Sequence, residues 1–210
     1  MEQPNYIRAL DEHFCARYSD YVKIAAIEGY SMPEMLYITK DGNIARRDSS
    51  RMRLCYQKEP AELLARFKEG LADTDFTFSF RFRTVKERFR DFFKRKHKTF
   101  ARVLPRVLAR CGETVESAGA KLAIEPEFWQ KIVKGSLYPE KCTVLALALT
   151  CRTSMEDAAE LRAASEFGFD DTIVRDVVVD YLLVQKIFNP EMQRACLAEY
   201  KIENLPIKRD

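Results

Sequence analysis

The segment from Arg81 to Lys98, RFRTVKERFRDFFKRKHK, has the highest density of charge in the chain. It contains nine Lys or Arg residues and two acids, Glu87 and Asp91. Clustered cations neutralise phosphates, so the segment is a candidate nucleic-acid-binding element. The candidate residues are Arg81, Arg83, Lys86, Arg88, Arg90, Lys94, Arg95 and Lys96. The alternative is a solvated helix that is basic outside and binds nothing specific. Its phenylalanines are expected to anchor it to the core: Phe82, Phe89, Phe92 and Phe93.

Residues with nucleophilic or metal-binding chemistry are scattered. His13 and Cys15 lie two positions apart on a predicted helix, so their side chains diverge by about 200° and form no local dyad. His97 lies in the basic segment, where solvent exposure is expected. The six cysteines include no CxxC pair and are expected to be reduced core residues. The sequence contains none of the common zinc-protease (HExxH), serine-hydrolase (GxSxG) or nucleotide-binding (Walker-type, GxGxxG) motifs. We therefore expect no catalytic residue, no cofactor and no metal.

The stretch from Val115 to Gly135, VESAGAKLAIEPEFWQKIVKG, has the spacing of two short helices that cross at a tight turn. Such a pair needs a small residue at the crossing and apolar residues that hold the second helix in place. The matching residues are Gly119 at the crossing, Ala123 and Ile124 in the turn, Trp129 and Ile132 at buried positions, and Gly135 at the end. On these residues the stretch resembles the Cro/C1 family of lambda repressor-like (XRE-type) helix-turn-helix proteins. The match continues at Pro139, Thr143, Leu147 and Ala148.

The resemblance implies that the exposed face of the second helix contacts DNA. The residues on that face are Glu127, Phe128, Gln130, Lys131 and Lys134. Three departures from the family weaken this expectation, one of which is Val115, at a position where many family members have a polar side chain. Ala123 stands where glycine is usual, which is expected to require a slightly different turn. Glu125 and Glu127 suit the positive end of the helix dipole but repel a phosphate backbone.

A second resemblance covers more of the C-terminal half. The run from the second helix of the motif through YLLVQKIFNPEMQRACLAEYKIENLPI is similar to the helical module that follows macro domains in some bacterial proteins. It implies a small module that attaches to varied partners. The N-terminal half has no macro-domain signature, so ADP-ribose binding is not implied.

The N-terminal half predicts a mixture of helices and strands. Apolar residues at helical spacing predict one long helix from Asn5 to Gly29. Two short apolar runs around Asp41-Gly42 predict a hairpin, and Pro60 and Gly70 bound a short helix. Strict alternation in DFTFSFRF predicts a strand. A basic helix from about Thr84 to Lys96 follows it.

From Thr99 onward the pattern is helical throughout. Pro105 is expected in the first turn of its helix, and Thr172 and Asn189 are expected to cap two later helices. The predicted helices run from about Phe100 to Cys111, Val115 to Leu122, Glu125 to Val133, Lys141 to Cys151, Ser154 to Ser165, Thr172 to Ile187, and onward from Pro190.

Composition bounds the class of protein. Apolar residues make up 47% and charged residues 32%, which favours an ordered globular chain. We expect an α+β domain at residues 1–96 and an all-helical domain at residues 97–210, packed together because no flexible linker separates them. The predicted fold is mainly α: a repressor-like helix-turn-helix bundle with extra C-terminal helices, preceded by a small α+β region with a short hairpin. Without a signal-like start or an apolar window long enough for a bilayer, a soluble cytoplasmic protein without membrane contact is expected.

The sequence leaves two functions open. The first is a DNA-binding regulatory protein of bacterial or phage type, which could act as a homodimer. The second is a protein-interaction or adaptor module that keeps a degenerate helix-turn-helix scaffold without sequence-specific DNA binding. The acidic first turn of the second helix favours the latter, as does Phe128, which is expected to be exposed. The partner is accordingly DNA or a protein.

Overall fold

A computed structural model describes residues 4–22, 35–41, 44–47, 60–71, 81–82, 84–87, 89, 99–203 and 205. The described chain is mainly helical, as the sequence predicts. The helices are α1 (Asn5–Arg17), α4 (Pro60–Gly70), α6 (Phe100–Arg110), α7 (Val115–Lys121), α8 (Pro126–Val133), α9 (Lys141–Thr150), α10 (Met155–Ala164), α11 (Val174–Val184) and α12 (Pro190–Glu199). The strands are β1 (Met35–Ile38), β2 (Ile44–Arg47), β3 (Arg81–Phe82) and β4 (Leu137–Tyr138).

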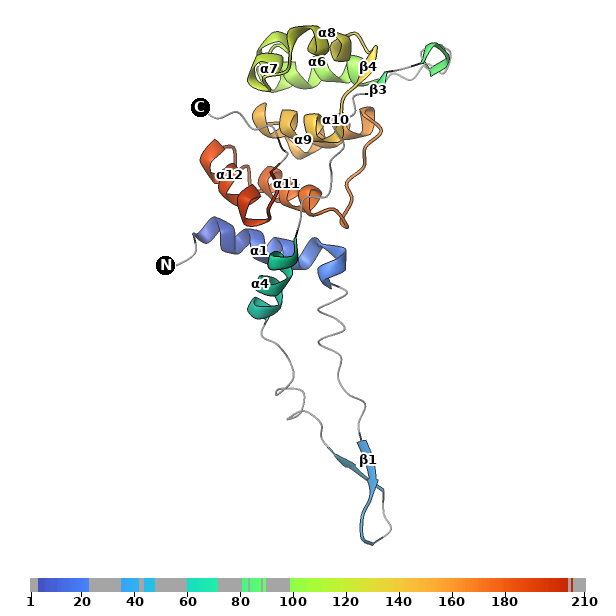
Figure 1. Cartoon of the computed structure of the whole chain (residues 1–210), viewed down its shortest axis with the longest axis vertical. Helices are drawn as coiled ribbons and strands as arrows, with labels where there is room; N and C mark the ends of the chain where they lie inside the picture. Colours follow the sequence, from blue (N-terminus) through green and yellow to red (C-terminus); the bar gives the residue numbers. More distant parts are fainter. Residues whose placement is uncertain are drawn as a thin grey trace.

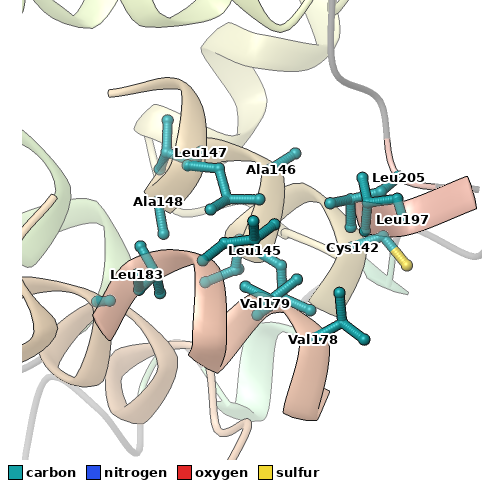
Figure 2. Packing of buried hydrophobic residues seen from close by; sticks show 14 of the residues in the cluster. Cys142, Leu145, Ala146, Leu147, Ala148, Val178, Val179, Leu183, Leu197 and Leu205 are labelled. Carbon is teal, nitrogen blue, oxygen red and sulfur yellow. The ribbon is translucent and has the colours of Figure 1, made fainter. Parts of the chain in front are cut away.

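Helix α9 forms the centre of the helical body. Each of its residues from Cys142 to Leu149 is buried, so it is covered on every side and not along one stripe. Its neighbours are α7, α10 and α11. Figure 2 shows leucines and alanines of α9 meeting Val178, Val179 and Leu183 of α11. Burial of this apolar helix supplies a large part of the hydrophobic stabilisation of the fold.

The other helices are arranged in layers on either side of α9 (Figure 1). On one side, α10 lies beside α9 and packs against α6, and α6 in turn packs against α7 and α8. On the other side, α11 lies between α9 and α1, and α12 contacts both α11 and α1. Contacts between α1 and the last two helices join the beginning of the chain to its end.

Two parts of this body are built alike. Helices α6 and α7 are joined at Cys111-Gly112-Glu113-Thr114, and α9 and α10 are joined at Cys151-Arg152-Thr153-Ser154. In each joint the last residue caps the next helix: Thr114 accepts a hydrogen bond from the Ser117 amide, and Ser154 accepts one from the Asp157 amide. The two pairs pack together through α6 and α10, where Arg106 and Arg110 both contact Glu160.

All seven helices from α6 to α12 end in the same way. The residue after the C-cap adopts a positive φ, and the amide that follows donates to the carbonyl five residues earlier. These positive-φ residues are Gly112, Ala123, Gly135, Arg152, Glu166, Lys186 and Lys201. Five of the seven are not glycine, so most of these turns adopt a conformation that costs an L-residue about 1–2 kcal/mol. Apolar residues just after several turns, including Ile187 and Ile202, pack into the core and help to offset that cost.

The predicted single helix from Asn5 to Gly29 is wrong in its described part. Helix α1 ends at Arg17, because Tyr18 is extended, and a short helical stretch resumes at residues 19–22. The Ser19 amide donates to the Asp171 carbonyl at 3.0 Å, so a contact with the loop before α11 accompanies the break. Residues 23–29 lie outside the described residues.

A polar cluster joins α1, α4 and α12. The ammonium group of Lys68 donates to the carboxylates of Asp11 and Glu199, both at 2.6 Å, and lies over the ring of Tyr200. The Tyr200 hydroxyl donates to Asp11 at 2.8 Å. Burial of this hydroxyl and the neighbouring Asp11 carboxylate raise the pKa of Tyr200. Aromatic rings pack beside the cluster, with Phe14 contacting Tyr18, Tyr21, Phe67 and Tyr200.

Two further predictions about helix starts are wrong. Pro105 lies inside α6, not in its first turn. Its ring nitrogen cannot donate to the Ala101 carbonyl, but the helix continues because Leu104 and Leu108 are buried on its inner face. Thr172 does not cap α11, which begins after Ile173. The Thr172 amide and hydroxyl donate to Asp170 instead, at 2.9 and 2.6 Å.

Other predicted elements agree with the described residues. Asn189 caps α12 by accepting hydrogen bonds from the amides of Glu191 and Met192. The second predicted helix coincides with α4, and β1 and β2 pair antiparallel with Met35 opposite Arg47. Of the predicted strand DFTFSFRF, the structure describes only β3. Most of the predicted basic helix lies outside the described residues, although residues 85–87 and 89 are helical.

Candidate functional site

Helices α7 and α8 cross where Gly119 meets Trp129. A Cβ atom added to Gly119 would lie 2.6 Å from the Trp129 ring, so only glycine permits this approach. The Trp129 indole nitrogen donates to the Val115 carbonyl at 2.7 Å, which ties the second helix to the first turn of α7. The Trp129 side chain is only 4% exposed. These contacts fix the angle at which α8 leaves the turn.

The turn between the two helices uses Ala123 in the left-handed region, with φ at 53°. The Ile124 amide donates to the Gly119 carbonyl at 3.3 Å, which closes the end of α7. The expectation that alanine requires a different turn from glycine is wrong in this respect, because Ala123 adopts the backbone angle that glycine would favour. The turn keeps the shape that glycine would give it. The cost is conformational strain, because the Cβ atom of Ala123 lies close to the backbone carbonyl at this positive φ.

The exposed face of α8 carries mixed charge. Its exposed residues are Glu125 at the N-cap, Pro126, Glu127 and Gln130, and Lys134 is exposed at the C-cap. Lys131 is half-buried, donates to Glu127 at 3.2 Å and lies over the ring of Phe128. The cation nearest the middle of the helix is thus already paired with an acid of the same helix.

Phe128 is not the exposed aromatic that the protein-interaction hypothesis invokes. It is half-buried and packs against the hydrophobic core while Lys131 covers its ring. Its contribution is therefore first to hold α8 in place. The surface left for a partner is formed by Pro126 and by the polar ends of four side chains: Glu125, Glu127, Gln130 and Lys134.

Strand β3 connects the basic segment to the helix pair. Arg81 pairs with Tyr138 and Phe82 with Leu137 of β4, the strand that follows α8. Leu137 is buried and β4 contacts α8, so this pairing places the start of the basic segment beside the C-terminal end of α8 (Figure 1). Residues more than fifty positions apart in the sequence therefore share one edge of the molecule.

The helix after β3 begins with a capping box. The Thr84 amide donates to the Glu87 carboxylate at 2.9 Å, and the Glu87 amide donates to the Thr84 hydroxyl at 3.3 Å. This reciprocal pair satisfies two amides that have no partner within the helix and defines Val85 as its first residue. This start agrees with the helix predicted from about Thr84, and the TVKE sequence is its local signal.

The phenylalanines of the basic segment do not all anchor it to the core, contrary to the expectation. Phe82 is 65% exposed and Phe89 is 60% exposed, and Val85 between them is 66% exposed. Lys86 is also exposed. Each of these apolar side chains and the lysine therefore faces solvent, and in Figure 1 the helical turn after β3 lies away from the helical body. Phe92 and Phe93 lie outside the described residues.

The described part of the chain contains only some of the predicted binding residues. Arg81 lies in β3, and Lys86, Gln130 and Lys134 are exposed. Six predicted cations lie outside the described residues: Arg83, Arg88, Arg90, Lys94, Arg95 and Lys96. His97 and Cys55 lie outside them too.

Sequence analysis missed several polar contacts around α9 and α11. Lys141 donates to the fully buried Asp176 at 2.7 Å, and an Arg175 guanidinium nitrogen donates to the Cys142 sulfur at 2.6 Å. Burial raises the pKa of Asp176, although Lys141 opposes the shift. His13 lies 3.5 Å from Asp180, between α1 and α11. These pairs connect neighbouring elements. Their partners are far apart in the sequence, so no local sequence pattern could have predicted them.

The buried cysteines have the properties of core residues. Cys142, Cys151 and Cys196 are buried and Cys15 and Cys111 are half-buried, and none of these five described cysteines forms a disulfide. Burial raises the pKa of Cys151 to about 12 and that of Cys196 to about 11. These two thiols therefore stay protonated at neutral pH, which disfavours nucleophilic chemistry at either position.

Within the described residues, no helix combines the length and apolar character needed to cross a bilayer.

Comparison with known proteins yields no match: no protein-family model, curated protein or solved structure corresponds to this chain. The functional argument therefore depends on the crossing of α7 and α8, the charge on α8, and the exposed surface after β3.

Gly119→Ala is expected to destabilise the protein by about 1–3 kcal/mol, because the new methyl group would overlap the Trp129 ring. Gly70→Ala is the matched control, since no atom lies within 4 Å of its added Cβ and α4 ends there. Urea unfolding of both variants measures the difference. Equal stability of Gly119→Ala and the parent protein would contradict the close approach of α7 and α8.

Ala123→Gly is expected to stabilise the protein by about 0.5–1 kcal/mol, because glycine removes the strain of the positive φ at a modest entropic cost. Ala120→Gly makes the same chemical change at an exposed position inside α7 and should destabilise by a similar amount. Thermal unfolding of the two variants should give shifts of opposite sign. A lower melting temperature for Ala123→Gly would show that this turn is not strained.

Proposed function

We propose that this protein is a DNA-binding regulatory protein of the helix-turn-helix type, with α7 and α8 as its DNA-binding pair. The observation that carries the proposal is the crossing of these helices, where Gly119 lies against Trp129 and Gly135 ends the second helix with a positive φ. These are the positions on which the resemblance to Cro/C1 repressors rests. Helices α6 and α9, which pack against this pair, would then hold it in place.

In this proposal α8 reads the major groove with Gln130, Lys131 and Lys134. Gln130 and Lys134 are exposed, and both side-chain types can hydrogen-bond to base edges or phosphates. Lys131 must leave Glu127 before it can do so. The carboxylate of Glu127 faces solvent on the same helix and opposes the approach of phosphates. Sequence readout by α8 is therefore expected to be weak.

The basic segment supplies most of the affinity. The pairing of β3 with β4 holds its beginning beside α8, so cations on both elements can contact one duplex. Each phosphate neutralised adds a salt-dependent contribution to binding. The cations assigned to this role are Arg81, Arg83, Lys86, Arg88, Arg90, Lys94, Arg95 and Lys96. A cytoplasmic location and a homodimer that presents two copies of α8 would fit such a regulator.

A second candidate is a protein-interaction module that uses the same scaffold without sequence-specific DNA binding. The acidic first turn of α8 favours it, because Glu125 and Glu127 are exposed on the surface that would otherwise face DNA. The similarity to modules that follow macro domains points the same way. A partner with a basic surface would complement these carboxylates.

Duplex binding is tested by fluorescence anisotropy with a labelled hairpin duplex across a range of salt concentrations. Replacing Arg88, Arg90, Lys94 and Arg95 with glutamine should weaken binding and reduce the salt slope by about one unit per lost phosphate contact. Lys186→Asn is the control: it removes a cation from the end of α11 and leaves asparagine at a positive φ that it tolerates. The proposal fails if duplex binding is absent at low salt or unchanged in the four-residue variant.

The position of α8 is tested by Glu127→Gln. If α8 faces DNA, loss of this carboxylate removes a repulsion and frees Lys131, and duplex affinity should rise about fivefold, equivalent to about 1 kcal/mol. Glu156→Gln is the matched control, since Glu156 is also an exposed acid in the first turn of a helix, on α10. Unchanged duplex affinity for Glu127→Gln would remove α8 from the DNA interface and favour the protein-interaction module.

A further inference from the structure

The surface formed by Phe82, Val85, Lys86 and Phe89 remains unexplained by a duplex-binding role. All four residues are exposed, and three are large apolar side chains with 60–66% of their surface accessible. None of these three belongs to the buried core or to the partly buried residues that pack against it. Exposed apolar residues that lie together usually mark a binding site, and Val85 and Phe89 are neighbours on one helical turn, four residues apart. Duplex backbone contacts require the cations but give no role to the rings.

The local structure holds these side chains in defined positions. Phe82 is fixed in β3 by its pairing with Leu137, which is itself buried. The capping box of Thr84 and Glu87 sets the start of the helix that follows. Val85 and Phe89 are four residues apart, so they lie on the same side of that helix. The two rings are thus presented by a strand and a helical turn that are joined by one short connection.

The charge of the surrounding sequence identifies the class of ligand. From Arg81 to Lys98 there are nine cations and two acids, so a polyanion is the complementary partner. The core of a protein–protein interface is depleted of charge, which makes a protein partner a poor match for this composition. A lipid surface would favour one continuous apolar stripe on a helix, whereas here the apolar side chains come from two elements.

Exposed aromatic rings among cations suit unpaired bases. A duplex hides the faces of its bases in the stack, whereas a single strand offers each face to an aromatic side chain. Lys86 and the other cations that adjoin the two rings in the sequence can follow the phosphates of the same strand. We propose that Phe82 and Phe89 stack on the bases of single-stranded nucleic acid, with Lys86 contacting its backbone. This inference extends the proposed DNA-binding function but assigns a different ligand to the surface after β3.

The test measures binding of the full chain to a labelled oligothymidine of about 20 nucleotides. Phe82→Ala and Phe89→Ala should each weaken binding by at least about fivefold, because one stacking contact contributes about 1–3 kcal/mol. Neither change alters the charge. Phe169→Ala is the matched control, since Phe169 is an exposed aromatic residue outside this surface, before α11. Its binding should equal that of the parent protein.

Stacking can be detected directly by the fluorescence of a tryptophan introduced with the substitution Phe82→Trp. The chain contains one tryptophan, Trp129, and its side chain is buried, so oligonucleotide should barely affect its emission. The indole introduced by Phe82→Trp should be quenched on addition of oligothymidine, and this variant should retain affinity. Binding without quenching, or binding unchanged in both alanine variants, would overturn the stacking proposal and leave charge alone as the cause.

Parallel titrations separate this inference from the proposed function. Binding to the hairpin duplex but not to oligothymidine would overturn the inference and leave the duplex-binding proposal intact. Ring-dependent binding to oligothymidine without duplex binding would support the inference and contradict the proposed function. Binding to vesicles of phosphatidylserine and phosphatidylcholine, with none to oligothymidine, would assign the surface to a membrane and overturn the inference.

Discussion

The complete burial of α9 is the constraint on which the rest of the structure depends. A helix that is apolar on all sides cannot remain at the surface, so other helices must cover it from several directions. Helix α10 covers one side and α11 another, with α7 also in contact. The layers seen in Figure 1 follow from this requirement. The proposed DNA-binding pair belongs to the outer layer on the α6 side, and α1 belongs to the outer layer on the opposite side.

Covering α9 buries polar groups near its two ends, and several of these groups have specific partners. At its N-terminal end, Lys141 pairs with the buried Asp176, and Arg175 donates to Cys142. At its C-terminal end, the Thr153 amide and hydroxyl both donate to the Ala148 carbonyl, at 3.0 and 3.1 Å. Unpaired polar groups at these depths would cost several kcal/mol, so the contacts are a condition for burying the helix.

The two surfaces with proposed functions differ in charge and in exposed apolar side chains. The buried Trp129 holds helix α8 in place, and the exposed face of this helix carries both carboxylates and cations. Such mixed charge contributes more to the choice between partners than to binding affinity. The surface after β3 carries exposed rings and lies in a strongly basic segment, which suits affinity for a polyanion. Because β4 follows α8 directly and pairs with β3, the two surfaces are mechanically connected. A ligand that contacts both could combine the two contributions.

Local sequence patterns determined which segments are helical and several of their caps. Helical periodicity located α6 to α12, and the Asn189-Pro190 pair marked the start of α12, because these signals act within a few residues. Tertiary structure decided what local signals cannot encode. The break at Tyr18 accompanies a contact with Asp171, and α6 continues through Pro105 because its inner face is buried. The alternating pattern could not predict that Phe82 is exposed. A period of two shows which residues share one face of a strand, but not whether another element covers that face.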